Sequence, residues 1–248
     1  MKILFSPSEG KTQLADYGVI DDNSFIFKDL YNKRLYALEL YNKYIQNADE
    51  KSLSSLFGIK DINEIKSFQN NIFSEKTCEA IKRYSGVSYS CLAYNSLNKN
   101  SQDYILNNTI IFSNLFGPIL AKDKIPYYKL KQGAKIGDFN LEKYYKDNFS
   151  ASLDTFLENE EIIDLRAGFY EKFYQIKKEY ITYKFIKGGK VVSHFSKAYR
   201  GILLRVLAEN NILSNNLLLN NLPSSLKQVD ITCKGYKTEI TLDVLENK

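Results

Sequence analysis

The sequence predicts a single mixed α/β domain in which helices surround a sheet. Short apolar segments of strand length alternate with longer segments of helical periodicity. The chain has 248 residues, 44% of them hydrophobic, which is near the upper limit for one hydrophobic core. No segment recurs at a fixed period, so the sequence does not indicate a repeat array. We therefore predict one domain over residues 1–248.

The first elements follow from local patterns. Residues 3–5 are apolar and predict a buried strand, which ends at the polar loop of residues 6–12. Helical spacing over residues 28–46 predicts a helix, whose inward positions are Leu30, Leu35, Leu38, Tyr41 and Ile45.

Residues 50–70 predict two helices joined by a tight turn at Gly58. The first helix covers residues 50–57, and Asp61 followed by Glu64 is a capping-box pattern that begins the second. This arrangement resembles the helix-hairpin-helix elements that bind DNA, where a glycine turn lets backbone N–H groups approach a phosphate. Plain packing of two helices is the alternative interpretation.

The remaining elements are predicted in order along the chain. We expect a helix at 75–83, a turn at 84–89 that leads into an extended or irregular segment, strands at 109–112 and 161–165, an extended segment at 125–130, a helix at 141–157, a hairpin of 180–186 with 191–195, a helix at 197–210, and two strands within 228–242.

The distribution of charge indicates an anionic partner. The chain has 34 Lys and Arg against 29 Asp and Glu, a net charge of +5. Residues 172–205 alone hold nine basic residues and one acidic residue. This local excess favours a polyanion or a phosphorylated ligand, although a lysine-rich solvated surface gives the same count.

The helix at 197–210 concentrates this charge. With 100° per residue, Lys197, Arg200 and Arg205 fall on one arc around Gly201, where a ligand or another backbone can come close. Arginine binds phosphate and carboxylate in a bidentate manner. Arg166, at the end of a predicted strand, is a second candidate for an anion contact, or the partner of Asp164 in an internal ion pair.

Candidate acid–base residues are few. Glu9, a candidate acid or base, and Lys11, a candidate anion contact, lie in the loop at 6–12, which lacks the glycine spacing of a phosphate-binding loop. A solvated turn is the alternative interpretation of this loop. His194 is the single histidine, and a proton carrier or a hydrogen-bonded structural residue are both consistent with it. Tyr127 and Tyr128, beside Lys129, suit base stacking or a core with a solvated edge.

The composition also indicates a compartment. Three dispersed cysteines without a CxxC pair predict a reducing environment, and with one histidine they predict no metal site and no cofactor. No apolar stretch reaches the roughly 20 residues of a membrane span, so we expect a cytoplasmic protein without a membrane partner.

Six segments together resemble the YaaA family of bacterial peroxide-stress proteins. They occur in the family's order and span nearly the whole chain. The segments are Ser6-Pro7-Ser8-Glu9-Gly10-Lys11-Thr12, Tyr84-Ser85-Gly86-Val87, Phe112-Ser113-Asn114-Leu115-Phe116-Gly117, Ile125-Pro126-Tyr127-Tyr128-Lys129-Leu130, Asp164-Leu165-Arg166, and His194-Phe195-Ser196-Lys197-Ala198-Tyr199-Arg200-Gly201.

The resemblance implies a single α/β domain with a helix-hairpin-helix-like element and a positively charged cleft. It further implies binding to double-stranded DNA and a cytoplasmic role in hydrogen peroxide stress, linked to lower free iron and less DNA damage. The alternative is an enzyme acting on a nucleic-acid base or nucleotide, with Glu9 or His194 as acid or base. The expected DNA or anion contacts are Lys11, Gly58, Lys129, Arg166, Lys197, Arg200 and Arg205.

Overall fold

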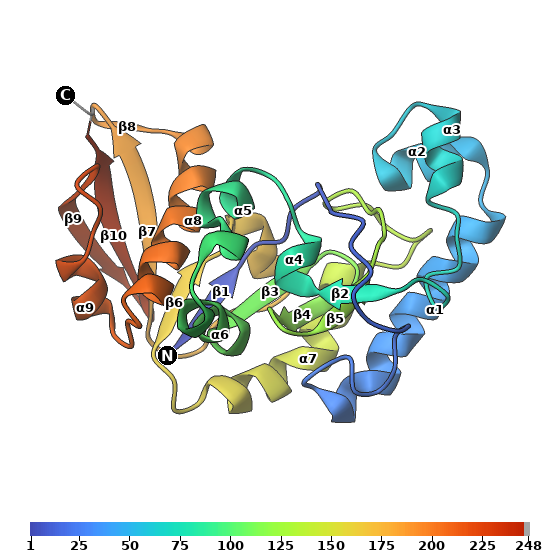
Figure 1. Cartoon of the computed structure of the whole chain (residues 1–248), viewed down its shortest axis with the longest axis horizontal. Coiled ribbons are helices and arrows are strands. Elements are labelled where there is room, and N and C mark those ends of the chain that lie inside the picture. Colours follow the sequence, from blue (N-terminus) through green and yellow to red (C-terminus); the bar gives the residue numbers. More distant parts are fainter. Residues whose placement is uncertain (246–248) are drawn as a thin grey trace.

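A mixed sheet forms the centre of the protein. The computed structural model describes residues 1–245, except the side chains of Ser193 and His194. The strands of the main sheet are arranged in the order β4-β3-β1-β6-β7-β10-β9, and β8 pairs with β7 (Figure 1). Their bounds are β1 (Lys2–Phe5), β3 (Thr109–Ser113), β4 (Gly117–Leu120), β6 (Ile162–Leu165), β7 (Tyr180–Lys187), β8 (Lys190–Val191), β9 (Leu226–Lys234) and β10 (Lys237–Val244). The predicted mixed α/β fold is confirmed.

The middle of this sheet is parallel. β1 lies between β3 and β6 and runs parallel to both, with Leu4 opposite Ile110 and Asp164. β7 continues the parallel arrangement on β6, and β10 on β7. All residues of β3 and β6 are buried, which is typical of parallel strands covered on both faces. The carboxyl ends of the parallel strands β1, β3 and β6 therefore lie at the same edge of the sheet.

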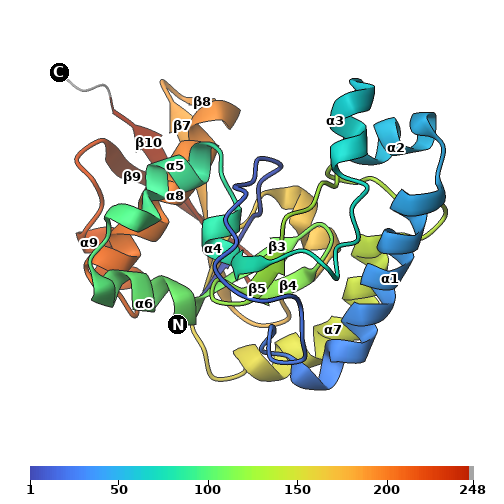
Figure 2. The ribbon, with the colours of Figure 1, turned by 45° about the vertical axis from the view of Figure 1, so that its right-hand side comes forward.

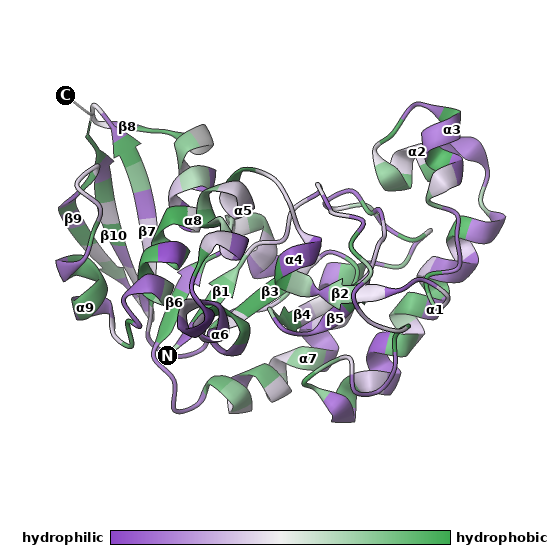
Figure 3. Cartoon of the chain, in the orientation of Figure 1, coloured by the Kyte–Doolittle hydropathy of each residue, from purple (hydrophilic) through white to green (hydrophobic). Residues whose placement is uncertain are grey.

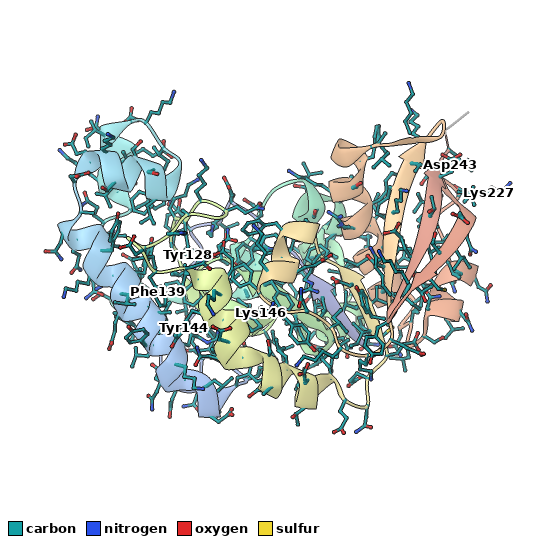
Figure 4. The ribbon with its side chains drawn as sticks, turned by 180° about the vertical axis from the view of Figure 1, so that it is seen from behind. Tyr128, Phe139, Tyr144, Lys146, Lys227 and Asp243 are labelled. Carbon is teal, nitrogen blue, oxygen red and sulfur yellow. The ribbon has the colours of Figure 1, made fainter. Side chains whose placement is uncertain are left out.

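Helices pack on both faces of the sheet. α5 (Val87–Leu92), α6 (Lys99–Asn108) and α8 (Ser193–Glu209) cover the face seen in Figure 1, and α7 (Leu141–Leu157) covers the face seen from behind in Figure 4. α7 has the predicted bounds, and Asn140 caps it by accepting from Lys143 N. In Figure 3, β3 is coloured hydrophobic, whereas α6 is largely hydrophilic.

The first helices extend the molecule at one end (Figure 2). A 3₁₀ turn (Lys28–Leu30) leads into α1 (Tyr31–Asn47). Of the five predicted inward residues, the turn buries Leu30 and α1 buries Leu38, Tyr41 and Ile45, whereas Leu35 is only half-buried. Aromatic contacts of Tyr144 on α7 with Tyr36 and Phe139 join α1 to α7 (Figure 4). α2 (Glu50–Phe57) and α3 (Ile62–Ser67) form the predicted helix pair.

Three local predictions are wrong. Residues 77–79 form a strand, β2 (Thr77–Glu79), which pairs with β5 (Lys124–Pro126), and only α4 (Ala80–Arg83) is helical. Residues 87–92, where we predicted a turn that leads into an extended or irregular segment, form α5. The predicted strand at 191–195 ends at Val191, because α8 begins at Ser193. The elements α9 (Asn215–Asn220), α6 and β4, and the short 3₁₀ turns Tyr94–Ser96 and Gly168–Lys172, were not predicted.

Candidate functional site

A pocket lies at the carboxyl ends of β1 and β6. It has a volume of about 370 Å³ and is lined by the loop after β1, the loop after β6, the start of α5 and one side of α8. Ligands of α/β proteins bind at this edge of a parallel sheet, where the loops after the strands converge. We call it the strand-end pocket.

The loop after β1 is held in place by its neighbours. The Ser6 hydroxyl accepts a hydrogen bond from Ala167 N at 2.8 Å, and the Ser6 carbonyl accepts one from the Tyr89 hydroxyl at 2.9 Å. The Gly10 carbonyl accepts from Ser85 N at 3.0 Å. These contacts join the loops after β1 and β6 to α5, so the pocket has a fixed wall.

Glycines allow close approach at two positions of this wall. Gly86 has φ +107°, and a Cβ atom there would lie 2.7 Å from the Ser8 hydroxyl. A Cβ atom at Gly201 would lie 2.0 Å from the Ser88 carbonyl oxygen, so α5 and α8 pack backbone to backbone. The Ser88 hydroxyl also donates to the Lys197 carbonyl at 2.7 Å. This contact places Lys197 and its helix against the pocket.

Two predicted cations line the strand-end pocket. Lys197 is exposed and Arg200 is half-buried, and both contribute to its lining. Among the residues that the structure describes, neither side chain makes a hydrogen bond or an ion pair. Burial lowers the pKa of Arg200, and the nearby Asp164 carboxylate acts in the opposite direction. The guanidinium nevertheless keeps its charge, as arginine does in proteins. The pocket therefore presents two positive charges that are not neutralised within the described chain.

Lys11 lies behind the same loop. Its ammonium donates to the carbonyls of Ser8 at 3.2 Å and Glu9 at 3.3 Å, both lining residues, and lies 4.3 Å from the centre of the Tyr128 ring. Burial, followed by the nearby charge of Lys129, lowers the pKa of Lys11 to about 7, which the Glu9 carboxylate opposes. Lys11 is thus the described lysine whose proton is most easily lost near neutral pH.

Tyrosine hydroxyls form a buried network beneath Lys11. The Tyr128 hydroxyl lies 2.9 Å from both the Tyr84 hydroxyl and the Ser113 hydroxyl. Burial raises the pKa of Tyr128 to about 12, so its hydroxyl stays protonated. In Figure 4, Tyr128 lies between the α1 end of the molecule and the sheet. Because Tyr128 is buried in this network, its ring is not available for the base stacking considered from the sequence.

An unsatisfied polar group lies beside the pocket. Tyr170 lines the pocket, and burial raises the pKa of its hydroxyl, which a hydrogen bond with Asn114 opposes. Asn114 follows β3 and is buried, and its Oδ1 atom has no hydrogen-bond partner. Buried polar atoms without partners are unusual and are typical of sites that await a ligand or water.

The structure does not bring Arg166 into the pocket. Its Nε and Nη2 atoms donate to the two carboxylate oxygens of Asp164, both at 2.8 Å, and its Nη1 donates to the carbonyls of Tyr170 and Tyr174. The guanidinium also stacks on Phe112 at 4.4 Å. Arg166 therefore makes the internal ion pair that the sequence offered as the alternative, and its donors face protein atoms.

Arg205 also points away from the predicted cluster. Its Nη1 donates to the Leu92 carbonyl at 3.1 Å and to the Ser96 hydroxyl at 2.9 Å, and its Nη2 pairs with Glu209 at 2.7 Å. It does not line the strand-end pocket. Its contacts at the carboxyl end of α5 give it a structural role, because cations there satisfy carbonyls that the helix leaves free.

The Gly58 turn contacts Lys131, which precedes the pocket residue Gln132. Gly58 has φ +69° and ends α2, and its N–H and that of Ile59 both donate to the Ser54 carbonyl. A Cβ atom at Gly58 would lie 3.0 Å from the Lys131 side chain, and Lys131 N donates to the Leu56 carbonyl. The two glycine-turn amides are thus bonded within the hairpin, and the hairpin's role in phosphate binding stays a prediction.

Of the two acid–base candidates, the structure places one. Glu9 is exposed at the pocket, and its Oε1 accepts from Gln132 N at 3.2 Å. The side chain of His194 lies outside the described residues. Glu9 and Lys197 therefore share one pocket, as an acid–base role beside the cations requires.

The sequence did not indicate several pocket residues. Ser6 could have been found, because it directly follows a predicted strand, as could Ala167 after β6. Tyr170 lies in the 3₁₀ turn Gly168–Lys172 and Gln132 in a loop, neither within a local motif, and only the fold brings them to Ser6. Tyr84, Ser113 and Tyr128 lie in three separate segments of the sequence, so the sequence did not indicate that their hydroxyls form one network.

The described residues contain no group of three or more His, Cys, Asp and Glu side chains that could hold a metal ion. Among them, no helix is both long enough and apolar enough to cross a bilayer.

Comparison with known proteins identifies relatives over nearly the whole chain. A family model described as "Peroxide stress protein YaaA" matches residues 1–232. An uncharacterized protein of Campylobacter jejuni is 56% identical over 246 residues, which are 99% of this chain and 100% of that protein. A UPF0246 protein of Corynebacterium efficiens is 32% identical over 84% of this chain and 85% of its own length, and one of Fusobacterium nucleatum is 28% identical over 86% and 87%.

Proposed function

The chain belongs to the YaaA family of peroxide stress proteins, and we propose that it acts in this response by binding DNA at the strand-end pocket. The observation that carries the proposal is the pair of cations Lys197 and Arg200, which line the pocket without a partner among the described residues. Two unpaired cations in a pocket attract an anion, and Lys and Arg side chains are the residues that chiefly neutralise DNA phosphates.

Further charges support the same surface. Lys11 and Lys129 lie close enough that the charge of Lys129 lowers the pKa of Lys11. An anion bound beside them would offset this repulsion and would raise the pKa of Lys11. Lys129 is therefore proposed, with Lys11, as a contact to the backbone of double-stranded DNA, or of another nucleic acid.

A binding measurement tests the proposal. In fluorescence anisotropy with a labelled duplex, the Lys197→Ala/Arg200→Ala double variant is expected to bind at least about tenfold more weakly than the unmodified protein. The matched control is Lys99→Ala/Lys143→Ala, which removes the same charge from exposed lysines that pair with Asp103 and Asp147 on α6 and α7. Equal weakening by both double variants would contradict a specific site, and unchanged affinity in the first would contradict the proposal.

An enzymatic role is a second candidate because Glu9 lines this pocket and the Lys11 amine is bonded to the carbonyls of two lining residues, Ser8 and Glu9. A lysine whose pKa is about 7 is half neutral at neutral pH, and such amines serve as bases and nucleophiles. The reaction would act on a nucleic-acid base or nucleotide held by the cations. Release of modified base or nucleotide from DNA, measured by mass spectrometry, tests this candidate, and an unaltered substrate at stoichiometric protein would contradict it.

The link to lower free iron is also part of the proposed stress function. Equilibrium dialysis of the purified protein against Fe²⁺ tests whether the protein itself binds the metal. Binding at one ion per chain would support direct sequestration, and no binding would contradict it.

A further inference from the structure

The strand β9 forms a free edge of the main sheet. It is the last strand in the sheet order, and Figure 1 shows it as the outermost strand, at the end of the molecule opposite α2 and α3. All of its residues after Leu226 are exposed. Within residues 1–245, β10 is the one strand that pairs with it. Such an edge presents a row of backbone N–H and C=O groups that can pair with another chain.

The turn between β9 and β10 determines which backbone groups face this free edge. The turn has two residues and begins at Gly235, which has φ +58°, so Lys234 and Lys237 are its closing hydrogen-bonded pair. Bonded and non-bonded pairs alternate along an antiparallel ladder. The N–H and C=O groups of Ile231 and Cys233 therefore point away from β10.

The regular part of the edge is limited by a bulge. The register with β10 shifts after Thr241, which leaves Val229 as an extra residue of β9. Residues 230–234 therefore form the regular edge. Within it, the Ile231 N–H donates to the Asp230 carboxylate at 2.8 Å, as expected of a group that points away from β10.

Apolar and charged side chains of the regular edge lack partners. Ile231 is 50% exposed, whereas Ile240, opposite it on β10, is buried. The Lys234 ammonium makes no hydrogen bond and no ion pair with the described part of the chain. The residue opposite Lys234 on β10 is another cation, Lys237, which is itself paired with Glu239 at 2.8 Å. Like charges directly opposite each other destabilise a sheet, so an acidic partner for Lys234 would be favourable.

A reversed second copy of β9 supplies these partners in one register. With a two-fold axis at Thr232, Ile231 lies opposite Cys233 of the second copy, and the two exchange both backbone hydrogen bonds. Asp230 then lies opposite Lys234 of the second copy, and the symmetry repeats this ion pair. An axis at Ile231 would place Cys233 opposite the bulge and would leave Lys234 without an acidic partner. An axis at Cys233 would place Ile231 opposite the turn.

We propose that β9 is the surface through which two copies of this chain associate, by antiparallel pairing of residues 230–234 about Thr232. The Ile231 N–H then bonds to the second copy, which releases the Asp230 carboxylate to pair with Lys234 of that copy. The charge pattern selects a second copy as the occupant, because an acid and a base at the two ends of one strand complement a reversed copy of the same strand. No residue of β9 lines the strand-end pocket, so this inference does not depend on DNA binding.

Sedimentation equilibrium of the full-length protein under reducing conditions tests the association. We expect a monomer to shift toward twice its mass as the concentration rises to about 1 mM. Asp230→Lys replaces two attractive pairs with two repulsive ones and should raise the dissociation constant at least about tenfold. Asp230→Lys/Lys234→Asp restores both pairs in reverse and should return the constant to within about threefold of the original. Asp147→Lys, the same reversal at an exposed residue of α7, is the matched control and should leave it unchanged.

Two outcomes of this measurement would overturn the proposal. A monomer at every concentration would overturn self-pairing and leave the edge to a strand of another protein. A dimer that Asp230→Lys does not weaken, or that the double reversal does not restore, would place the association elsewhere on the surface.

Disulfide formation tests the register without a change of charge. Two residues at a non-hydrogen-bonded antiparallel pair have Cα atoms about 4.5 Å apart, which is within disulfide range. Thr232→Cys in a Cys233→Ser background is therefore expected to give a disulfide-linked dimer under mild oxidation, seen by non-reducing electrophoresis. Thr238→Cys in the same background makes the same exchange on β10, one strand inside the edge, and should remain unlinked. Both variants keep Cys78 and Cys91, so background linking is the same.

A third variant separates the possible axes. Ile231→Cys in the Cys233→Ser background places its cysteines diagonally across the proposed axis and should link more slowly than Thr232→Cys. Faster linking by Ile231→Cys would move the axis to that residue and overturn the proposed register. Equal linking by Thr232→Cys and Thr238→Cys would overturn pairing through β9.

Discussion

Replacement of Gly201 by alanine tests the contact on which the pocket wall depends. The added Cβ atom would lie 2.0 Å from the Ser88 carbonyl oxygen, 2.8 Å from its carbon and 3.1 Å from its Cα, and all three are backbone atoms. Ordinary contact begins near 3.4 Å, so α5 and α8 would have to separate by about 1.4 Å. No side-chain rotation can relieve this overlap.

The expected cost follows from three effects. Overpacking of this kind costs about 1–3 kcal/mol. Separation of the helices also strains the hydrogen bond from the Ser88 hydroxyl to the Lys197 carbonyl, which is worth about 1 kcal/mol. Alanine recovers up to about 1 kcal/mol through its higher helix propensity. We therefore expect Gly201→Ala to lower the free energy of unfolding by about 1–3 kcal/mol.

Thermal and urea denaturation followed by circular dichroism measure this change. For a chain of this size, the expected loss corresponds to a decrease in Tm of about 3–10 °C. Gly18→Ala is the matched control, because a Cβ atom at Gly18 meets nothing within 4 Å, and its stability should change by less than about 0.5 kcal/mol. If Gly201→Ala were as stable as Gly18→Ala, the close packing of α5 on α8 would be refuted.

Two further predictions concern buried charges. Arg166→Met leaves the Asp164 carboxylate buried without its partner, so the free energy of unfolding measured in urea titrations should fall by about 3–5 kcal/mol. The folded variant should keep its affinity for duplex DNA. A loss of affinity without a loss of stability would show that Arg166 binds DNA directly. Burial raises the pKa of Asp123 to about 7, against the opposing charge of Arg34, so the folded state holds a proton that the unfolded state releases near pH 4. This proton uptake contributes about 4 kcal/mol to the free energy of unfolding, a contribution that is complete below pH 4 and is lost as the pH rises to 7. In denaturation measured from pH 4 to 8, Asp123→Asn should make the free energy of unfolding depend less on pH. An unchanged dependence on pH would contradict this prediction.

Much of the fold could be predicted where a local pattern determines the element. The α7 helix has the predicted bounds because an apolar stripe follows a capping asparagine at 140. The strands β1, β3 and β6 are short apolar runs that the core requires. By contrast, β2 is a strand because it pairs with β5, more than 40 residues later, and no local signal reports that pairing.

The candidate site was likewise predictable only where a local pattern determines a residue's position. Helical periodicity placed Lys197, Arg200 and Arg205 on one arc, and the structure places the first two at the pocket. Arg205 lies a turn further along α8, where the end of α5 supplies carbonyl acceptors, and the sequence contains no sign of that helix crossing. The lowered pKa of Lys11 likewise depends on Lys129 and on burial, which only the fold brings together.

The salt dependence of duplex binding tests the proposed DNA site most directly. Each phosphate contact contributes a slope of about −0.9 to log affinity against log salt concentration. If Lys197 and Arg200 each neutralise one phosphate, the slope for Lys197→Ala/Arg200→Ala should be shallower than that of the unmodified protein by about 1.8, whereas Lys99→Ala/Lys143→Ala should keep the original slope. Equal slopes for all three proteins, or binding that does not depend on salt, would contradict the assignment of the strand-end pocket to DNA.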